Sequence, residues 1–198
     1  MAKKLKSSLL NMFLSLTVIS AVASGLLAVV NNATAGKIAE GEMKAKQDGL
    51  LAVTPQFDND PFAEVVTVQI NGTDVLLYPA RQGEELVGVA AEVLTHAGYG
   101  GDISLLIGLN PEDFTVINYS VLSHSETPGL GDRMEEWFRV EGTNQSVLGV
   151  SLAKPIAVTK DGGTIDAISA ATITSRAFVG GLNTASAALR QAQEQGLL

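Results

Sequence analysis

The amino-terminal part of the chain contains a long uncharged segment that limits what the protein can be. No charged residue occurs in residues 7–36, and residues 9–30 are dense in Leu, Val, Ile, Phe and Ala. About 20 such residues are enough for a helix to cross the hydrocarbon core of a bilayer. The sequence therefore predicts either a retained transmembrane helix or a cleaved signal peptide.

Both alternatives place the rest of the chain outside the cytoplasm. Lys3 and Lys4 make a basic start, and the small residues 33–35 would suit a cleavage site. The apolar run is longer than the 7–15 residues usual in a signal peptide, so a retained, single-pass anchor is favoured. Because lysines stay on the cytoplasmic side, residues 1–36 are expected to be a cytoplasmic N-terminus and anchor in the cytoplasmic (inner) membrane. Residues 37–198 would then form one periplasmic or extracytoplasmic domain.

Composition excludes several functional classes. The net charge is −8, and three of the 13 basic residues lie within the first six, so the acidic body argues against nucleic acid as a partner. The absence of cysteine excludes disulfides, thiolate-bound iron–sulfur clusters and cysteine nucleophiles. The only histidines, His96 and His124, lack the paired spacing of metal ligands, and no metal site is predicted. Any redox cofactor should therefore be organic.

The middle of the chain has the pattern of an antiparallel sheet. After a weak helix in residues 37–53, the apolar runs 65–70 and 74–78 flank Asn71-Gly72, the strongest short-range hairpin signal. Three further strand-like runs follow at residues 85–95, 103–109 and 114–122. The connections are too short for crossover helices, so the sheet should be mainly antiparallel.

The carboxyl-terminal third should add helices and short strands. We expect a helix in residues 132–140 capped by Asp132, with Trp137 and Phe138 in the core, and strands at residues 147–152 and 156–158. A final helix in residues 175–194 has apolar residues at i, i+4, i+7 and i+11, which should pack on the sheet. The fold class is therefore α+β: a transmembrane helix followed by one domain with a mainly antiparallel sheet and packed helices. The apolar face consists of Phe178, Leu182, Ala185 and Leu189.

A hydroxyl-rich segment directly before the last helix is suited to binding an anion. Ser169, Thr172, Thr174 and Ser175 precede the apolar pattern. The N–H groups that begin a helix lack intrahelical partners, and the helix dipole is positive there. A phosphate could be held at this point without a lysine. The alternative is that Thr174 or Ser175 is simply the N-cap of the helix.

Two loops could contribute to the same site. Residues 98–101 read Gly-Tyr-Gly-Gly, which is either an ordinary turn or a place where backbone and Tyr99 approach a planar ligand. Residues 123–132 contain a proline and two glycines that specify a loop path, either for ligand contacts or as a rigid surface loop. His124, in that loop, is expected to be a hydrogen-bonded structural residue.

Three motifs together resemble a known family. They are residues 98–101, His124-Ser-Glu-Thr-Pro-Gly-Leu-Gly131, and Asp166-Ala-Ile-Ser-Ala-Ala-Thr172 with the following Ile-Thr-Ser. They are similar to the G subunit of the Rnf ion-translocating ferredoxin:NAD oxidoreductase complex, and less closely to the C subunit of the sodium-pumping quinone reductase. With the anchor, the likeness covers nearly the whole chain.

The resemblance implies a cofactor, partners and site residues. Family members carry FMN as a phosphoester on a threonine, attached by a flavin transferase, and the matching residue is Thr172. The implied function is a membrane-anchored electron-transfer flavoprotein within a membrane complex that moves ions, with no substrate turned over by this chain alone and no catalytic residue in it. Its partners would be the other subunits of that complex. The implied FMN-binding residues besides Thr172 are Ser169, Thr174, Ser175, Tyr99, Gly100, Glu126, Thr127, Leu130 and Gly131.

One position departs from the family motif. Ala170 stands where the motif has glycine, and a positive φ there would strain alanine by about 1–2 kcal/mol. Two alternative functions follow from the residues: an exported module that binds a phosphorylated ligand reversibly at the same helix start, and a structural subunit that has lost its flavin.

Overall fold

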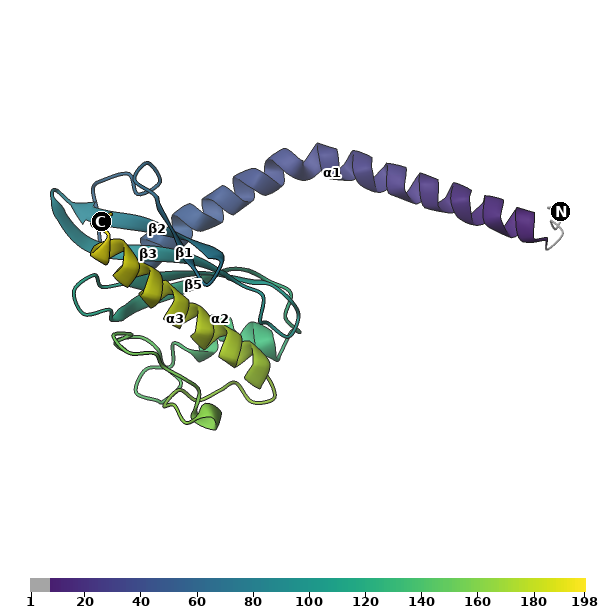
Figure 1. Cartoon of the computed structure of the whole chain (residues 1–198). Coiled ribbons are helices and arrows are strands. Elements are labelled where there is room, and N and C mark those ends of the chain that lie inside the picture. The colour runs from purple at the N-terminus through teal and green to yellow at the C-terminus, as the bar shows by residue number, and fades with distance from the viewer. Residues whose placement is uncertain (1–7) are drawn as a thin grey trace. The chain divides into compact units, whose positions relative to one another are not determined.

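The computed structural model describes residues 8–198 (Figure 1). The described chain divides into two compact units, with the boundary between Lys44 and Ala45. Lys3 and Lys4, on which the predicted membrane orientation depends, lie outside the described residues.

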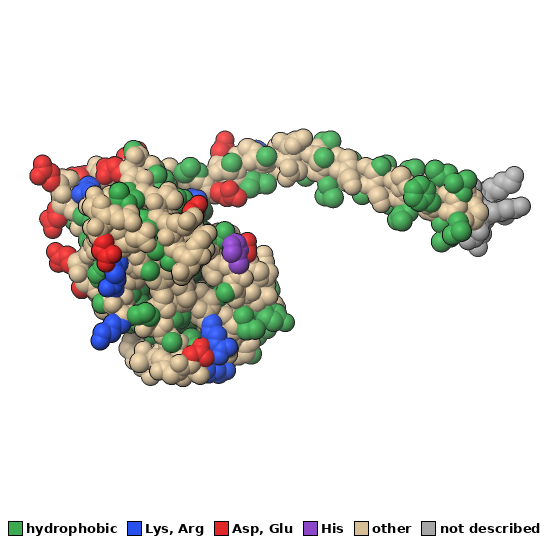
Figure 2. All heavy atoms as spheres, viewed as in Figure 1, with side chains coloured by type: hydrophobic (Ala, Val, Ile, Leu, Met, Phe, Trp, Pro, Cys, Tyr) green, Lys and Arg blue, Asp and Glu red, His purple; other side chains and the backbone are tan. Residues whose placement is uncertain are grey.

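The first unit is helical. Helix α1 (Leu9–Val53) joins the predicted membrane segment and the predicted weak helix without interruption. No proline occurs before Pro55, and a proline disfavours helical conformation in the residue before it, so the helix ends just ahead of that position. In the described chain α1 is the one helix long and apolar enough to cross a membrane, and the leucines, valines and isoleucines of its residues 9–38 are exposed (Figure 2). The anchor boundary at residue 36 falls inside α1 and stays a prediction.

The second unit is built on the predicted antiparallel sheet, which confirms the α+β fold class. Its five strands follow one another in chain order, each paired with its neighbours in antiparallel fashion. Asn71 and Gly72 both have positive φ, as a two-residue hairpin turn requires. The strands are β1 (Val66–Ile70), β2 (Thr73–Gln82), β3 (Glu85–Thr95), β4 (Ile103–Leu109) and β5 (Val116–His124).

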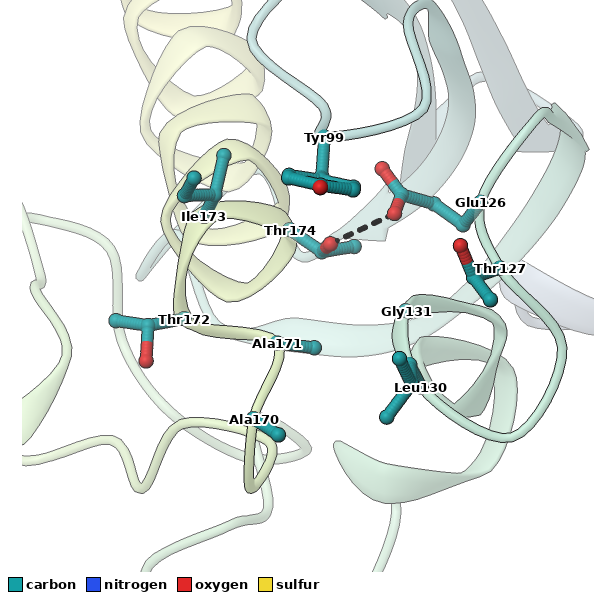
Figure 3. Close-up of a pocket in the computed structure, with 10 residues that line it drawn as sticks. All are labelled: Tyr99, Glu126, Thr127, Leu130, Gly131, Ala170, Ala171, Thr172, Ile173 and Thr174. Carbon is teal, nitrogen blue, oxygen red and sulfur yellow. Dashed lines mark hydrogen bonds between the residues drawn. The ribbon is translucent and has the colours of Figure 1, made fainter.

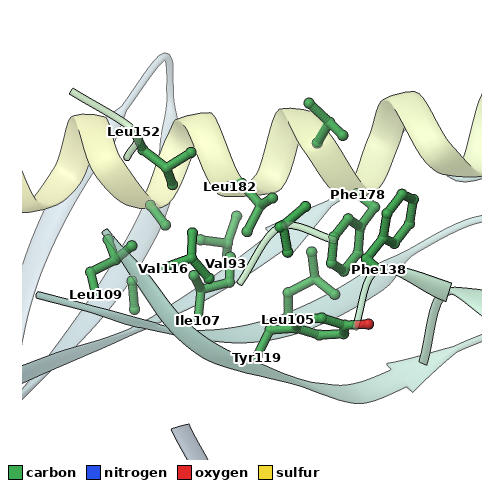
Figure 4. Packing of buried hydrophobic residues seen from close by; sticks show 14 of the residues in the cluster. Val93, Leu105, Ile107, Leu109, Val116, Tyr119, Phe138, Leu152, Phe178 and Leu182 are labelled. Atoms are coloured by element: carbon green, nitrogen blue, oxygen red, sulfur yellow. The ribbon is translucent and has the colours of Figure 1, made fainter. Parts of the chain in front are cut away.

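Helix α3 (Thr172–Glu194) covers one face of this sheet. The predicted apolar face is confirmed, because Phe178, Leu182, Ala185 and Leu189 are all fully buried. Phe178 stacks on Phe138 with ring centroids 4.3 Å apart and meets the edge of Tyr119 at 4.8 Å (Figure 4).

The last turns of α1 lie against the opposite face of the sheet. Leu50 and Val53 pack with Tyr78 and Leu106 in a second apolar cluster. A Cβ on Gly108 would lie 1.7 Å from the carbonyl oxygen of Val53, so this glycine permits close approach of helix and strand. The domain core therefore begins within α1.

Several predictions about the carboxyl-terminal third are wrong. The predicted helix 132–140 is only a 3₁₀ turn, η1 (Gly131–Arg133), followed by α2 (Met134–Trp137), and Asp132 caps neither. Residues 147–152 and 156–158 form isolated bridges rather than strands, because turns at Gly149 and Gly162 redirect the chain. The last helix begins three residues earlier than expected, and neither Thr174 nor Ser175 is its N-cap. Residues 159–161, for which no element was predicted, form the 3₁₀ turn η2 (Thr159–Asp161).

Tyr119 should make the stability of the domain sensitive to alkaline pH. Burial raises the pKa of its phenol to about 12, and its hydroxyl donates to the carbonyl of Met134 at 2.8 Å. Because the folded-state pKa exceeds the unfolded value of about 10, this contribution is complete below pH 10 and falls as the pH rises through 12. Tyr119→Phe should lower the free energy of unfolding by about 1–3 kcal/mol at pH 8. Urea titrations at pH 8 and pH 11 should show a smaller difference at pH 11; an unchanged difference would contradict the assignment.

Candidate functional site

A pocket lies where three segments distant in sequence meet. It has a volume of about 370 Å³, within the range of small-molecule sites. The turn after β3 contributes Tyr99, the loop after β5 contributes four residues, and the start of α3 contributes the remainder (Figure 3). Its lining residues are Tyr99, Glu126, Thr127, Leu130, Gly131, Ala170, Ala171, Thr172, Ile173 and Thr174.

The carboxylate of Glu126 holds these three segments together. It is buried, with one oxygen accepting from the Thr174 hydroxyl at 2.9 Å and the other from the Gly100 N–H at 3.1 Å. One side chain thus ties the first turn of α3 and the glycine turn to the Glu126 loop. Buried carboxylates are normally satisfied in this way, because an unpaired one is costly to desolvate.

The glycines of the 98–101 turn allow backbone to pack on backbone. A Cβ on Gly100 would lie 2.1 Å from the carbonyl oxygen of Ser125, and a Cβ on Gly98 would lie 2.3 Å from that of Gly101. Gly100 therefore allows this turn to pack against the neighbouring loop, and the approach of the turn to a planar ligand stays a prediction. Tyr99, which is 71 % exposed, projects at the mouth of the pocket (Figure 3).

His124 has the structural role predicted for it. Its Nδ1 accepts from the N–H of Glu126 at 3.1 Å, and its Nε2 lies 3.2 Å from a carboxylate oxygen of Glu135. The ring therefore links the end of β5 to α2 and orients the first residue of the pocket-lining loop. It does not line the pocket.

The segment before α3 is held in position by hydrogen bonds from Ser175 and Trp137. The Ser175 hydroxyl donates to the carbonyl of Ala171 and accepts from the N–H of Ile168, both at 2.9 Å. The Trp137 indole donates to the carbonyl of Asp166 at 2.9 Å. These bonds fix the approach of the chain to Thr172, the first residue of the helix.

The start of α3 provides donors for an anion. No side chain caps the helix, and the first N–H groups of any helix have no intrahelical partner. The ammonium of Lys160, in η2, donates to the Thr172 hydroxyl at 2.9 Å. Thr172 lies at the edge of the pocket with its side chain directed away from Leu130 (Figure 3). An anion bonded to Thr172 would therefore meet a lysine as well as the helix dipole.

The structure brings most of the predicted site residues together. Tyr99, Glu126, Thr127, Leu130, Gly131, Thr172 and Thr174 line one pocket, and Gly100 supports it through Glu126. Ser169 is exposed and Ser175 is fully buried, and neither lines the pocket. The sequence prediction missed Lys160 and assumed that no lysine was needed. The spacing of Lys160 from Thr172 follows no helical or strand period, so no sequence signal indicated this contact. The pocket residues Ala170, Ala171 and Ile173 adjoin Thr172 in the motif and could have been included in the predicted site.

Ala170 has the backbone conformation that glycine favours. Its φ is +64°, in the left-handed region that strains alanine by about 1–2 kcal/mol. Because it lies in the bend immediately before α3 and lines the pocket, the strain is located at the site itself. Despite this strain, the hydrogen bonds made by Ser175 and Trp137 hold the chain in position up to Thr172, where the helix begins.

Ala170→Gly should therefore stabilise the protein. Relief of strain exceeds the larger entropy that glycine loses on folding, which leaves a net gain of up to about 1 kcal/mol in the free energy of unfolding. The matched control is Ala63→Gly, at an exposed alanine without positive φ, which should be neutral or destabilising. Urea titration of the full chain in detergent measures both. A loss of stability in Ala170→Gly would contradict the assigned strain.

The pocket suits a planar aromatic ligand carrying a phosphate. Tyr99, Leu130 and Ile173 provide partly exposed apolar walls, and Thr172 with Lys160 provides the anion-binding end. The walls can exclude water from one part of a ligand while the helix start and the lysine hold its charged part.

Comparison with known proteins agrees with this arrangement. The family described as FMN-binding domain matches residues 98–187, which include all three pocket-forming segments. A protein from Cereibacter sphaeroides, named as the G subunit of an ion-translocating oxidoreductase complex, is 39% identical over 190 residues, covering 90% of this chain and 83% of the relative. Proteins of the same name from Stutzerimonas stutzeri and Shewanella piezotolerans are 37% and 35% identical, covering 85% and 91% of this chain and 75% and 89% of their own lengths.

Proposed function

The chain belongs to the family of G subunits of Rnf ion-translocating oxidoreductase complexes, and on this basis we propose that it is a membrane-anchored electron-transfer flavoprotein. It acts as part of an oxidoreductase complex that translocates ions and turns over no substrate by itself. The long apolar helix α1 and the FMN-binding domain support this function.

The cofactor is FMN, joined by a phosphoester to Thr172. The observation that carries this assignment is the position of Thr172, which opens an uncapped helix at the edge of the pocket with its hydroxyl 2.9 Å from the Lys160 ammonium. A pocket of about 370 Å³ with apolar walls beside this anion-binding end fits a planar ring joined to a phosphate. Thr172 takes no part in the redox chemistry.

The protein side chains position and shield the cofactor. When bound, FMN supplies the one- and two-electron chemistry, and the chain has no cysteine that could supply a thiol–disulfide couple. Tyr99, Leu130 and Ile173 provide the apolar surfaces against which the cofactor ring would pack. Glu126 holds the three pocket-forming segments together and presents a carboxylate at the pocket wall. The covalent bond prevents loss of the cofactor outside the cytoplasm.

The orientation and the partners complete the proposal. The N-terminus is cytoplasmic, α1 crosses the cytoplasmic membrane once, and the domain lies on the opposite side. The other subunits of the complex exchange electrons with this chain, and a flavin transferase attaches its FMN. The family membership and the exposed apolar helix support this placement.

Expression with and without a flavin transferase tests the function. The full chain is expressed in membranes, solubilised in detergent and separated on a denaturing gel. We expect a fluorescent band only with the transferase, and an intact mass raised by that of FMN less one water. Peptide mapping should place the added mass on the peptide that contains Thr172.

The other outcomes identify the alternative functions. Flavin that purifies with the native chain but is lost on denaturation would mean reversible binding of a phosphorylated ligand. Absence of flavin in both states would mean a structural role without a cofactor, and Ala170, with its strained φ of +64°, is the residue that favours that reading. In the latter case Ala170→Gly should restore labelling if strain alone prevents it.

A further inference from the structure

The contact between Lys160 and Thr172 joins two different secondary-structure elements. Lys160 belongs to η2, and Thr172 is the first residue of α3. The Nζ–Oγ1 distance is 2.9 Å, which is a normal length for a hydrogen bond in which the ammonium donates. The lysine is exposed, and it lies outside the group of pocket-lining residues.

A second contact fixes the same two segments. Asp161, next to Lys160, accepts two hydrogen bonds from the Arg176 guanidinium at 2.6 and 2.7 Å. The hydrogen bond from Arg176 holds the pKa of the Asp161 carboxyl below its ordinary value. Arg176 lies in the second turn of α3, so the ion pair closes η2 onto the helix that begins at Thr172. Both groups are well exposed, so the pair orients the turn more than it stabilises the fold.

The turn itself has little freedom. Gly162 ends η2 with φ of 84°, and a Cβ on Gly163 would lie 1.9 Å from the carbonyl oxygen of Ala157. The N–H of Thr159 donates to the carbonyl of Ile165 at 2.8 Å. The backbone that carries Lys160 is therefore set before any ligand arrives.

The charge of Lys160 is available for a ligand. Asp161 is paired with Arg176, and within residues 8–198 Lys160 has no carboxylate within ion-pairing distance. The buried carboxylate of the site, Glu126, accepts hydrogen bonds from Thr174 and Gly100. A phosphate at Thr172 would thus meet one cation that no acidic side chain neutralises.

We propose that Lys160 is the positioning residue for the attachment of FMN to Thr172. This inference rests on the proposed function. The ammonium fixes the orientation of the Thr172 hydroxyl, on a residue that lines the pocket, and offsets the negative charge of the incoming phosphate. Asp161 and Arg176 hold the turn from which the lysine reaches.

The attachment step can be written so that it balances. The co-reactant is a flavin dinucleotide, in which FMN is one half of a pyrophosphate. Thr172 Oγ1 attacks the phosphorus of the FMN half, an Oγ1–P bond forms, and the P–O bond to the other mononucleotide breaks. That mononucleotide leaves with the electron pair, and the threonine proton passes to a base of the transferase. Lys160 stays protonated throughout, so nothing is oxidised or reduced.

Rates of flavin attachment test the role of Lys160. The full-length chain is purified in detergent without flavin and incubated with transferase and a flavin dinucleotide, and labelling is followed by in-gel fluorescence and intact mass. Lys160→Met should lower kcat/KM for labelling by roughly ten- to a hundred-fold, the factor expected for one hydrogen bond to a charged group. Lys160→Arg should retain more activity than Lys160→Met, because the charge remains. Asp161→Asn should lower the rate by a smaller factor.

The controls separate this role from folding and from the proposed function. Lys154→Met removes an exposed lysine with no contact to the site and should leave both the labelling rate and Tm unchanged. Labelling of Lys160→Met at the wild-type rate, with Thr172 still modified, would overturn the role of Lys160 alone. A lowered rate accompanied by a matching loss of Tm in every Lys160 variant would also overturn it. Absence of label in the wild-type chain, or label away from Thr172, would overturn the proposed function and this inference together.

Discussion

Replacing Thr172 with alanine should abolish covalent flavin entirely. The variant, expressed with a flavin transferase, is expected to show no fluorescent band on a denaturing gel and the intact mass of the unmodified chain. The physical reason is that, in the described chain, Thr172 is the only hydroxyl residue that lines the pocket, opens α3 and contacts Lys160. The hydroxyls of Thr174 and Ser175 are engaged with Glu126 and with Ala171.

Two variants show whether the loss is specific. Thr172→Ser keeps the nucleophilic oxygen and should still be labelled. Thr184→Ala removes a hydroxyl from the same helix, where it bonds to the carbonyl of Gly180 outside the pocket, and should be labelled as the wild type is. Thr172→Ala should change the free energy of unfolding by less than about 1 kcal/mol, so misfolding would not explain the result. Retention of covalent flavin in Thr172→Ala would show that another residue carries it.

Replacing Phe178 with alanine should cause the largest loss of stability. Its ring is fully buried between the sheet and the short helix, stacked on Phe138 at 4.3 Å and edge-on to Tyr119 at 4.8 Å. Truncation of a buried phenylalanine typically removes about 3–5 kcal/mol from the free energy of unfolding, through lost burial and the cavity that remains. Urea titration of the full chain in detergent measures this loss.

The effect of Phe178→Ala should extend to the pocket. Phe178 lies six residues after Thr172, on the face of α3 that packs on the core. Because the helix start is positioned by this packing, flavin labelling should fall together with stability. Phe178→Leu refills most of the volume and should lose clearly less stability. A loss of under about 1 kcal/mol in Phe178→Ala would contradict the tight packing seen around this ring.

Local sequence patterns were sufficient for most of the sheet. The Asn71-Gly72 turn needs positive φ at both residues, which these two residue types accept, so the hairpin could be predicted from a few positions. The runs predicted at residues 85–95 and 103–109 match β3 and β4. The short segments 147–152 and 156–158 have the same composition but no neighbouring strand along their length, and they form only isolated bridges. The residue types within a segment do not show whether the fold will place another strand beside it.

The start of the last helix illustrates a different limit. Thr174 and Ser175 are good capping residues, and a local argument therefore placed the helix boundary there. In the folded chain the Thr174 hydroxyl donates to Glu126, 48 positions away, and Ser175 braces Ile168. Both residues lie inside the first turn of the helix, which begins at Thr172.

By itself the sequence determined the apolar anchor segment, the antiparallel order of the strands, the apolar face of α3, and the motif that ends in Thr172. Each of these depends on the chemistry of residues close together in the chain, on periodicity, or on a turn that few residues can form. Only the tertiary structure decided the positive φ of Ala170, the meeting of three segments around Glu126, and the contact of Lys160 with Thr172. These three features depend on how turns place side chains that are far apart in the chain, and the spacing of residues along the sequence does not predict that placement.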